Sequence, residues 1–141
     1  MQPVYLAGHS RPVRKIMYNH DGDLLFTCSD DGTICMYNTY DCSRIGMFYI
    51  KEACKSFDLT KDSKYLLASA TTFGIQIYKI INGDLVTKLE VPGSRAKQIK
   101  QVELALGDKQ FLVLYENEKQ SNINIYDLDK VINSQHEDSL I

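Results

Sequence analysis

The sequence lacks several features that mark specialised classes of protein. No apolar run approaches the roughly 20 residues of a membrane-spanning helix, and no basic segment followed by an apolar core opens the chain, so we expect neither a membrane span nor a secretory signal. The charges nearly balance, with 16 Lys and Arg against 18 Asp and Glu, which argues against strong non-specific binding to nucleic acid. Tryptophan is absent.

The four cysteines do not form a recognisable metal or redox motif. None is part of a C-x-x-C pair, and the three that are spaced by seven residues have no histidine at a zinc-like distance. Two of these three also fall on expected strands. We therefore predict reduced thiols and no metal at Cys28, Cys35, Cys42 and Cys54.

What is present is an ordinary globular composition, 44% hydrophobic and 24% charged, in a chain long enough for one domain with a real core. Residues 8–38 form the clearest unit, with expected strands at 13–18, 24–29 and 33–38 separated by turns rich in Asn, Asp and Gly. Both faces of 24–29 are largely uncharged, which indicates a strand covered on both sides.

Two weaker copies of this unit follow it. The turn residues Asp21, Asp62 and Asp108 are 41 and 46 residues apart. The motifs ICMYN, IQIYK and INIYD align in the same register. We expect further strands at 44–50, 54–59, 65–70, 75–80, 85–91, 98–104, 110–116 and 122–128. A period of about 40–45 residues with four short strands per copy is typical of a WD-repeat β-propeller.

The predicted fold is therefore all-β, with about three propeller blades. Blade 1 covers about 8–50, blade 2 about 51–91 and blade 3 about 92–128 without its outer strand, followed by a polar tail at 129–141. A separate strand at 2–7 is expected to complete the last blade of the ring. Propellers need about 4–8 blades, so we expect the N-terminal part of a longer protein; a short chain completed by partners is the alternative.

The Gly8-His9 turn points to a structural cluster. In WD repeats the histidine of this turn lies near an Asp of the second hairpin turn, a Ser or Thr of strand two and a Trp of strand three. Those positions match His9, Asp31, Thr27 and Tyr37, with tyrosine in place of tryptophan. A carboxylate hydrogen-bonded to an imidazole fixes its tautomer and orientation, so we predict a structural rather than catalytic role.

No catalytic, cofactor-binding or metal-binding residue is predicted. Asp30 and Asp31 could be paired catalytic carboxylates, but no convergent partner accompanies them and a turn is the preferred interpretation. Arg11, Arg14 and Lys15 could contact phosphate or an acidic partner; a solvated loop and strand edge is preferred.

The opening blade resembles one WD-repeat family, the i subunits of eukaryotic translation initiation factor three. The similarity rests on residues 8–31, most specifically YNHDGDLLF at 18–26, then on Arg44-Ile45-Gly46 and on SNINIY at 121–126. It is looser in the second copy.

The resemblance implies a seven-bladed, non-catalytic, cytoplasmic scaffold. It also implies that the protein joins the b and g subunits on the small ribosomal subunit, without membrane, cofactor or small-molecule substrate. Another WD-repeat adaptor, associated with a receptor kinase or with assembly of an RNA complex, is the alternative. An enzyme carried on a propeller is a third hypothesis.

Overall fold

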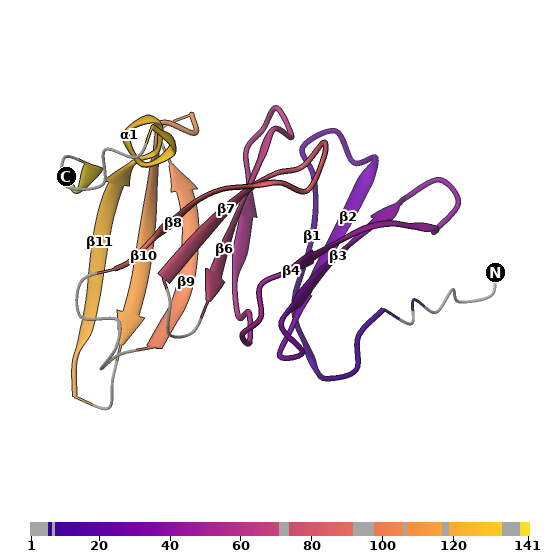
Figure 1. Ribbon diagram of the computed structural model, residues 1–141, viewed down its shortest axis with the longest axis horizontal. Helices are drawn as coiled ribbons and strands as arrows, with labels where there is room; N and C mark the ends of the chain where they lie inside the picture. Colours follow the sequence, from indigo (N-terminus) through magenta and orange to yellow (C-terminus); the bar gives the residue numbers. More distant parts are fainter. Residues whose placement is uncertain are drawn as a thin grey trace.

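Three antiparallel sheets stand side by side in the computed structural model (Figure 1). The structure describes residues 6, 8–70, 74–91, 98–105, 107–116, 119–133 and 139–141. Within each sheet the strands follow one another in sequence order, as expected for propeller blades. The described residues contain no helix of the length and hydrophobicity that crossing a membrane requires.

All eleven strands expected in the three copies are confirmed, with every end within three residues of its predicted position. The first sheet contains β1 (Val13–Tyr18), β2 (Leu24–Ser29), β3 (Thr33–Asn38) and β4 (Arg44–Tyr49). The second contains β5 (Phe57–Leu59), β6 (Tyr65–Ala70), β7 (Gly74–Lys79) and β8 (Leu85–Leu89). The third contains β9 (Gln98–Ala105), β10 (Gln110–Glu116) and β11 (Ser121–Asp127).

The largest difference from the sequence prediction is at β5, which was expected from residue 54 and begins at Phe57. The backbone before it is engaged elsewhere. The Cys54 N–H donates to the carbonyl of Ser29 at 3.1 Å, and the Ser56 N–H donates to Ser69 Oγ at 3.1 Å. These bonds tie the Cys54 N–H to the first sheet and the Ser56 N–H to a side chain, so Ser56 keeps only one bond of the regular ladder, from the Ser69 N–H to its carbonyl at 3.0 Å.

The sheets are held together by two apolar clusters. One lies between the first and second sheets and includes the wholly buried Phe26, Cys28 and Phe57. The other lies between the second and third sheets and includes Ile77 and Phe111. The second sheet is therefore covered on both faces, and burial of nonpolar area is the main attraction between blades.

The side chains of β2 alternate between two buried faces. Phe26 and Cys28 point into the cluster shared with the second sheet. Thr27, which alternates with them, is buried on the opposite face. This confirms the prediction that both faces of the strand are covered.

Lys15 reaches from β1 into the second sheet. Its Nζ donates to the Phe57 carbonyl at 2.7 Å and lies 5.3 Å from the centre of the Phe57 ring. The ammonium group thus links β1 to the start of β5 through a hydrogen bond and a cation–π contact.

The turns at one end of the sheets also contact each other from blade to blade. Asn19 Nδ2 donates to Ser63 Oγ at 3.1 Å, linking the β1–β2 turn to the β5–β6 turn. The backbone N–H of Lys61 donates to Asp108 Oδ2 at 2.6 Å, linking the second turn to the β9–β10 turn. These bonds fix the spacing of neighbouring sheets at their turn ends.

The segment after β11, expected as a polar tail, forms a short helix, α1 (Leu128–Ile132). Asp127 caps it by accepting a hydrogen bond from the Lys130 N–H, and Leu128 and Val131 are buried in the second cluster. Further along, Leu140 pairs with Tyr126 in an isolated antiparallel bridge. Residues 128–132 and 140–141 of the expected tail therefore pack against β11 and the second cluster.

Two predictions fall largely outside the described residues. Of the expected strand at 2–7 only Leu6 is described; it is part of no strand and is exposed. The turn expected at 92–94 lies wholly outside the described part of the chain.

Candidate functional site

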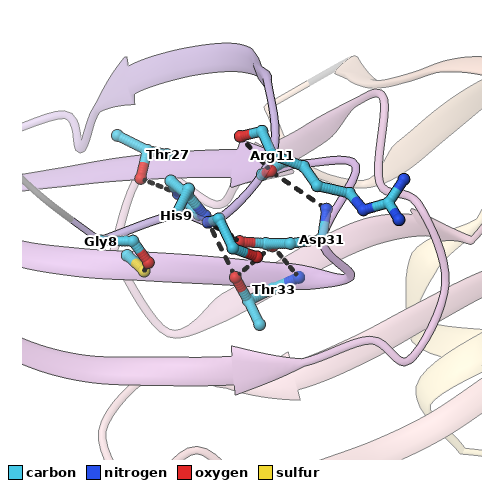
Figure 2. Close-up of polar contacts among 9 residues, drawn as sticks. Gly8, His9, Arg11, Thr27, Asp31 and Thr33 are labelled. Carbon is cyan, nitrogen blue, oxygen red and sulfur yellow. Dashed lines mark hydrogen bonds and ion pairs between the residues drawn. The ribbon is translucent and has the colours of Figure 1, made fainter.

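The predicted cluster around His9 is assembled from four places in the first blade (Figure 2). Gly8 and His9 precede β1, Thr27 lies on β2, Asp31 lies in the β2–β3 turn and Thr33 begins β3. The turn is tight because Gly32 has a φ of 82°, a left-handed conformation that favours glycine.

The imidazole of His9 is held at both nitrogens. Nδ1 lies 3.0 Å from Asp31 Oδ2 and 3.1 Å from Thr33 Oγ1, and Nε2 lies 2.6 Å from Thr27 Oγ1. A carboxylate only accepts hydrogen bonds, so a neutral imidazole here carries its proton on Nδ1 and accepts from the Thr27 hydroxyl at Nε2. The geometry therefore selects one tautomer.

Asp31 is the centre of this network. It accepts from the Ser10 N–H at 3.1 Å, from the Thr33 N–H at 2.9 Å and from the Thr33 hydroxyl at 2.6 Å. Burial works to raise the pKa of its carboxyl, but the hydrogen bonds from Thr33, Ser10 and His9 lower that pKa to about 2. Asp31 is thus an anion that the surrounding donors stabilise.

Tyr37 lies beside the network, against Gly8. A Cβ at Gly8 would fall 1.9 Å from the Tyr37 hydroxyl oxygen, so only glycine allows this approach. Tyr37 is buried, which raises the pKa of its phenol. The Gly8 carbonyl also accepts from the Cys35 thiol at 3.4 Å. The structure thus brings all four predicted residues together and adds Thr33, which the sequence analysis missed.

The order Thr27, His9, Asp31 is that of a nucleophile, a base and an orienting carboxylate. Catalysis by such a triad requires a nucleophile that substrate can reach. Thr27 is only 7% exposed and the His9 side chain only 5% exposed. What this arrangement can do is lock the Gly8-His9 segment onto the β2–β3 turn through a set of satisfied polar groups.

The second and third blades each have a tyrosine at the position of Tyr37, but there its hydroxyl bonds to a side-chain amide. Tyr78 donates its hydroxyl proton to Gln76 Oε1 at 2.5 Å, and Tyr126 accepts from Asn124 Nδ2 at 3.1 Å. Both amides stand two residues before their tyrosine, where the first blade has Cys35. The sequence analysis missed Gln76 and Asn124, although their repeated position in the aligned motifs is a usable signal.

Four of the five charged residues that invited a chemical interpretation, Asp30, Asp31, Arg14 and Lys15, are bonded within the first two blades. Arg14 Nε donates to Asp30 Oδ1 at 2.9 Å, and its Nη2 contacts the other oxygen. The hydrogen bond from Arg14 lowers the pKa of Asp30. Since Lys15 is bonded to the second sheet, the three basic residues do not form one open patch.

Among the described residues, no group of three or more His, Cys, Asp or Glu side chains is placed to hold a metal ion. All four cysteines are free thiols; Cys42 is exposed and the others are buried.

Comparison with known families adds a description of the first blade. The family model described as "WD domain, G-beta repeat" (WD40) matches residues 2–38. Among solved structures, "Crystal structure of RRP9 WD40 repeats" superimposes with a TM-score of 0.78 at 13% identity, covering 96% of this chain and 39% of that one. At that identity the similarity shows the fold: part of a WD40 β-propeller.

Curated relatives match nearly the whole chain. Eukaryotic translation initiation factor 3 subunit I of Dictyostelium discoideum is 29% identical over 132 residues, which is 92% of this chain and 39% of the relative. The protein of the same name from Schizosaccharomyces pombe is 32% identical over 117 residues, or 82% of this chain and 34% of the relative. The chain thus spans little more than a third of these relatives.

Proposed function

Since this chain is a WD40-repeat protein whose curated homologues are subunit I of eukaryotic translation initiation factor 3, we propose that it is a non-catalytic scaffold subunit of that factor. The observation that carries the proposal is the extent of the similarity, which covers 92% of the chain in one relative and 82% in another. It therefore includes blades beyond the one that the WD40 model matches.

The site geometry supports a scaffold role. The polar network at His9 is buried and internally satisfied, and the sheets are joined by continuous apolar clusters. In such an arrangement the polar groups bond to one another and make the blades rigid. A rigid set of blades presents loops and edges at fixed positions to binding partners.

The proposal includes the partners and the location. The chain contributes to a propeller that joins the b and g subunits near the small ribosomal subunit in the cytoplasm, without membrane or small-molecule substrate. In this propeller the blades cover about 8–50, 51–91 and 92–128, each containing one of the three sheets, and the strand at 2–7 completes the ring.

The test is recovery of an affinity-tagged full chain from cells of its source organism, with the co-purifying proteins identified by mass spectrometry. Other initiation factor 3 subunits and 40S proteins should be recovered together. A matched bait in which the wholly buried Phe26 is replaced by Asp should lose them, because a buried unpaired charge unfolds the first two blades.

Recovery of neither the other subunits nor 40S particles would refute the assignment. Recovery of a receptor kinase or an RNA-assembly complex instead would favour the alternative adaptor function.

A further inference from the structure

The first strands of the three sheets, β1, β5 and β9, begin at the same end of the molecule. The turns that follow these strands contact one another at the opposite end. Bonds also join the strands near their starts: Lys15 of β1 donates to the Phe57 carbonyl, and Ser56 Oγ accepts from the Val102 N–H of β9 at 3.3 Å. The start of β5 therefore lies between those of β1 and β9.

Each blade has a cation at the same position of this end. Arg14 in β1 and Lys100 in β9 are both skipped by the pairing with the next strand, so each is the extra residue of a β-bulge. A bulge leaves its extra residue unpaired and redirects its side chain. Lys55, just before β5, follows Arg14 by 41 residues, which is also the spacing of the turn residues Asp21 and Asp62.

Arg11 adds a further cation, and together with Arg14 and Lys55 it surrounds Asp30. The hydrogen bond from Arg14 contributes most to lowering the pKa of Asp30, and the charges of Lys55 and Arg11 lower that pKa further. One carboxylate offsets only one of these three cations. Neither Lys55 nor Lys100 forms an ion pair with any residue that the structure describes.

Three carboxylates that flank these cations are already engaged. Asp30 accepts from Arg14, and Asp31 is buried in the network around the imidazole. Glu116, at the same end of the third sheet, accepts from the Ser121 hydroxyl at 3.0 Å. The positive charges at this end therefore exceed the carboxylates that are left to offset them.

The four cations form a basic row across the three blades: Arg11, Arg14, Lys55 and Lys100. The two arginines are exposed, and the two lysines are partly exposed. Sheets packed face to face are about 10 Å apart, so a row across three blades is about 20 Å long. An extended chain advances about 3.3 Å per residue, so about six residues would follow the whole row.

We propose that the basic row binds an extended acidic segment of a partner polypeptide, with carboxylates recurring about every third residue so that each blade meets at least one. The inference is independent of the proposed function, because it needs only the strand starts. Further blades would pack against the faces of the sheets and leave these strand ends uncovered, so the row stays accessible in a larger ring.

An acidic polypeptide fits the row better than single-stranded RNA does. Sites that bind single strands without sequence preference combine a basic groove with aromatic side chains on which the bases stack. The exposed aromatic residues of the described chain, Tyr18, Tyr40 and Tyr49, lie at none of the three strand starts. The slight excess of acidic residues in the whole chain also opposes non-specific contact with nucleic acid.

The probe is a fluorescein-labelled peptide, GEEGEEGEEG, in which pairs of glutamates recur every third residue. Titration with the full chain should give saturable binding by fluorescence anisotropy. The matched peptide GQQGQQGQQG, which has the same length and no side-chain charge, should not bind. Raising the salt concentration from about 20 to about 200 mM should weaken binding of the glutamate peptide severalfold, because the contacts are between exposed charges.

A double variant of the chain tests the row itself. Replacing Lys55 and Lys100 together by Gln should raise Kd about fivefold or more. The melting temperature should change little, since neither ammonium group has an ion pair to lose. The matched control replaces Lys61 and Lys109 by Gln. Both are exposed in turns at the opposite ends of β5 and β9, so the control changes the net charge equally and should leave Kd unchanged.

Asp30→Asn should have the opposite effect. Asp30 competes with an incoming carboxylate for Arg14, so its neutralisation should lower Kd about threefold. Asp21→Asn makes the same change in net charge at an exposed turn of the other end and should leave Kd unchanged.

The proposal is overturned if the glutamine peptide binds as tightly as the glutamate peptide, or if neither binds. Equal weakening by the two double variants would also overturn it, because net charge alone would then explain binding. A fluorescein-labelled oligouridine that binds more tightly than the glutamate peptide, and loses affinity in the Lys55 and Lys100 variant, would identify RNA as the occupant instead. If that double variant does not fold, Lys100→Gln alone and Asp30→Asn decide the matter.

Discussion

At the scale of single residues, the His9 network shows how buried polar groups can satisfy one another's hydrogen bonds. Each polar atom of the imidazole and of the Asp31 carboxylate has a partner within 3.1 Å. Removing one member leaves the others unsatisfied, and a buried unsatisfied group is costly. The role of these residues is therefore best tested by stability rather than by turnover.

His9→Ala should lower the free energy of unfolding by about 1–3 kcal/mol, because Asp31 and Thr27 lose a buried partner. Urea unfolding followed by fluorescence or circular dichroism measures the change. His20→Ala, in the exposed β1–β2 turn, is the matched control and should have little effect. An unchanged unfolding midpoint for His9→Ala would contradict the structural role.

Asp31 should make stability depend on pH in acid. Its pKa is about 2 in the folded chain and near 3.8 when unfolded, so its contribution is complete above about pH 4 and disappears as pH falls through 2. The stability difference between the wild type and Asp31→Asn should therefore shrink from pH 5 to pH 2. Exposed Asp21→Asn is the control, and a difference that stays constant would refute the assignment.

At the scale of elements, the turns both shape each sheet and connect it to the next. Asn19 accepts from the Leu24 N–H at 3.1 Å through Oδ1, which closes its own turn, and donates to Ser63 of the next blade. Asn19 is only 5% exposed, so its amide is a buried structural contact.

Asn19→Ala should destabilise the chain by about 1–3 kcal/mol, because it removes a buried amide and the bonds that it makes to partly buried groups in two blades. Asn82→Ala removes a comparable side-chain bond, to the Asp84 N–H at 3.0 Å, at an exposed turn and should cost less. Thermal unfolding of both variants gives the comparison. Equal losses would show that the contact between blades adds nothing.

The sequence was a good guide to these elements because their determinants are local. Alternating apolar residues and Asp-Gly or Asn-rich turns place the strands within three residues. The start of β5 could not be placed, because it depends on contacts with other segments of the chain. The amide partners of Tyr78 and Tyr126 are local, two residues before each tyrosine, and were missed although that repeated position is visible in the sequence. Helix α1 has a local signal, the Asp127 cap, that was hidden by the polar composition of the tail.

Most of the candidate site was predicted from a family pattern and not from local determinants. His9, Thr27, Asp31 and Tyr37 could be named because they match a family pattern, and the structure brings them together. Thr33 could not, because its contact with His9 depends on how the Gly32 turn redirects the chain.

At the scale of the whole molecule, the three sheets differ in how they are covered. The middle sheet has a neighbour on each side, whereas the outer faces of the first and third sheets carry exposed apolar residues. These include Ile16 (64% exposed) and Tyr18 (59%) on β1. Apolar faces of this kind mark contact surfaces and favour association in water.

Replacing both Ile16 and Tyr18 by Thr should reduce binding of the dye ANS and concentration-dependent light scattering, while leaving the melting temperature nearly unchanged. Threonine retains a strand preference and removes apolar area. The matched double substitution of the buried Leu66 and Leu67 should instead lower the melting temperature sharply. ANS binding that persists in the first variant would show that this face is not the dye's site.

Because Lys15 is held over the Phe57 ring, the lysines of this protein should react with amine reagents at different rates. An acylating reagent can modify Lys51 and Lys61 freely, because both extend into water, but to reach Lys15 it must first break the bond to the Phe57 carbonyl. The rate at which Lys15 is acylated therefore reports how often its bond to the β5 backbone opens, without any label being built into the chain.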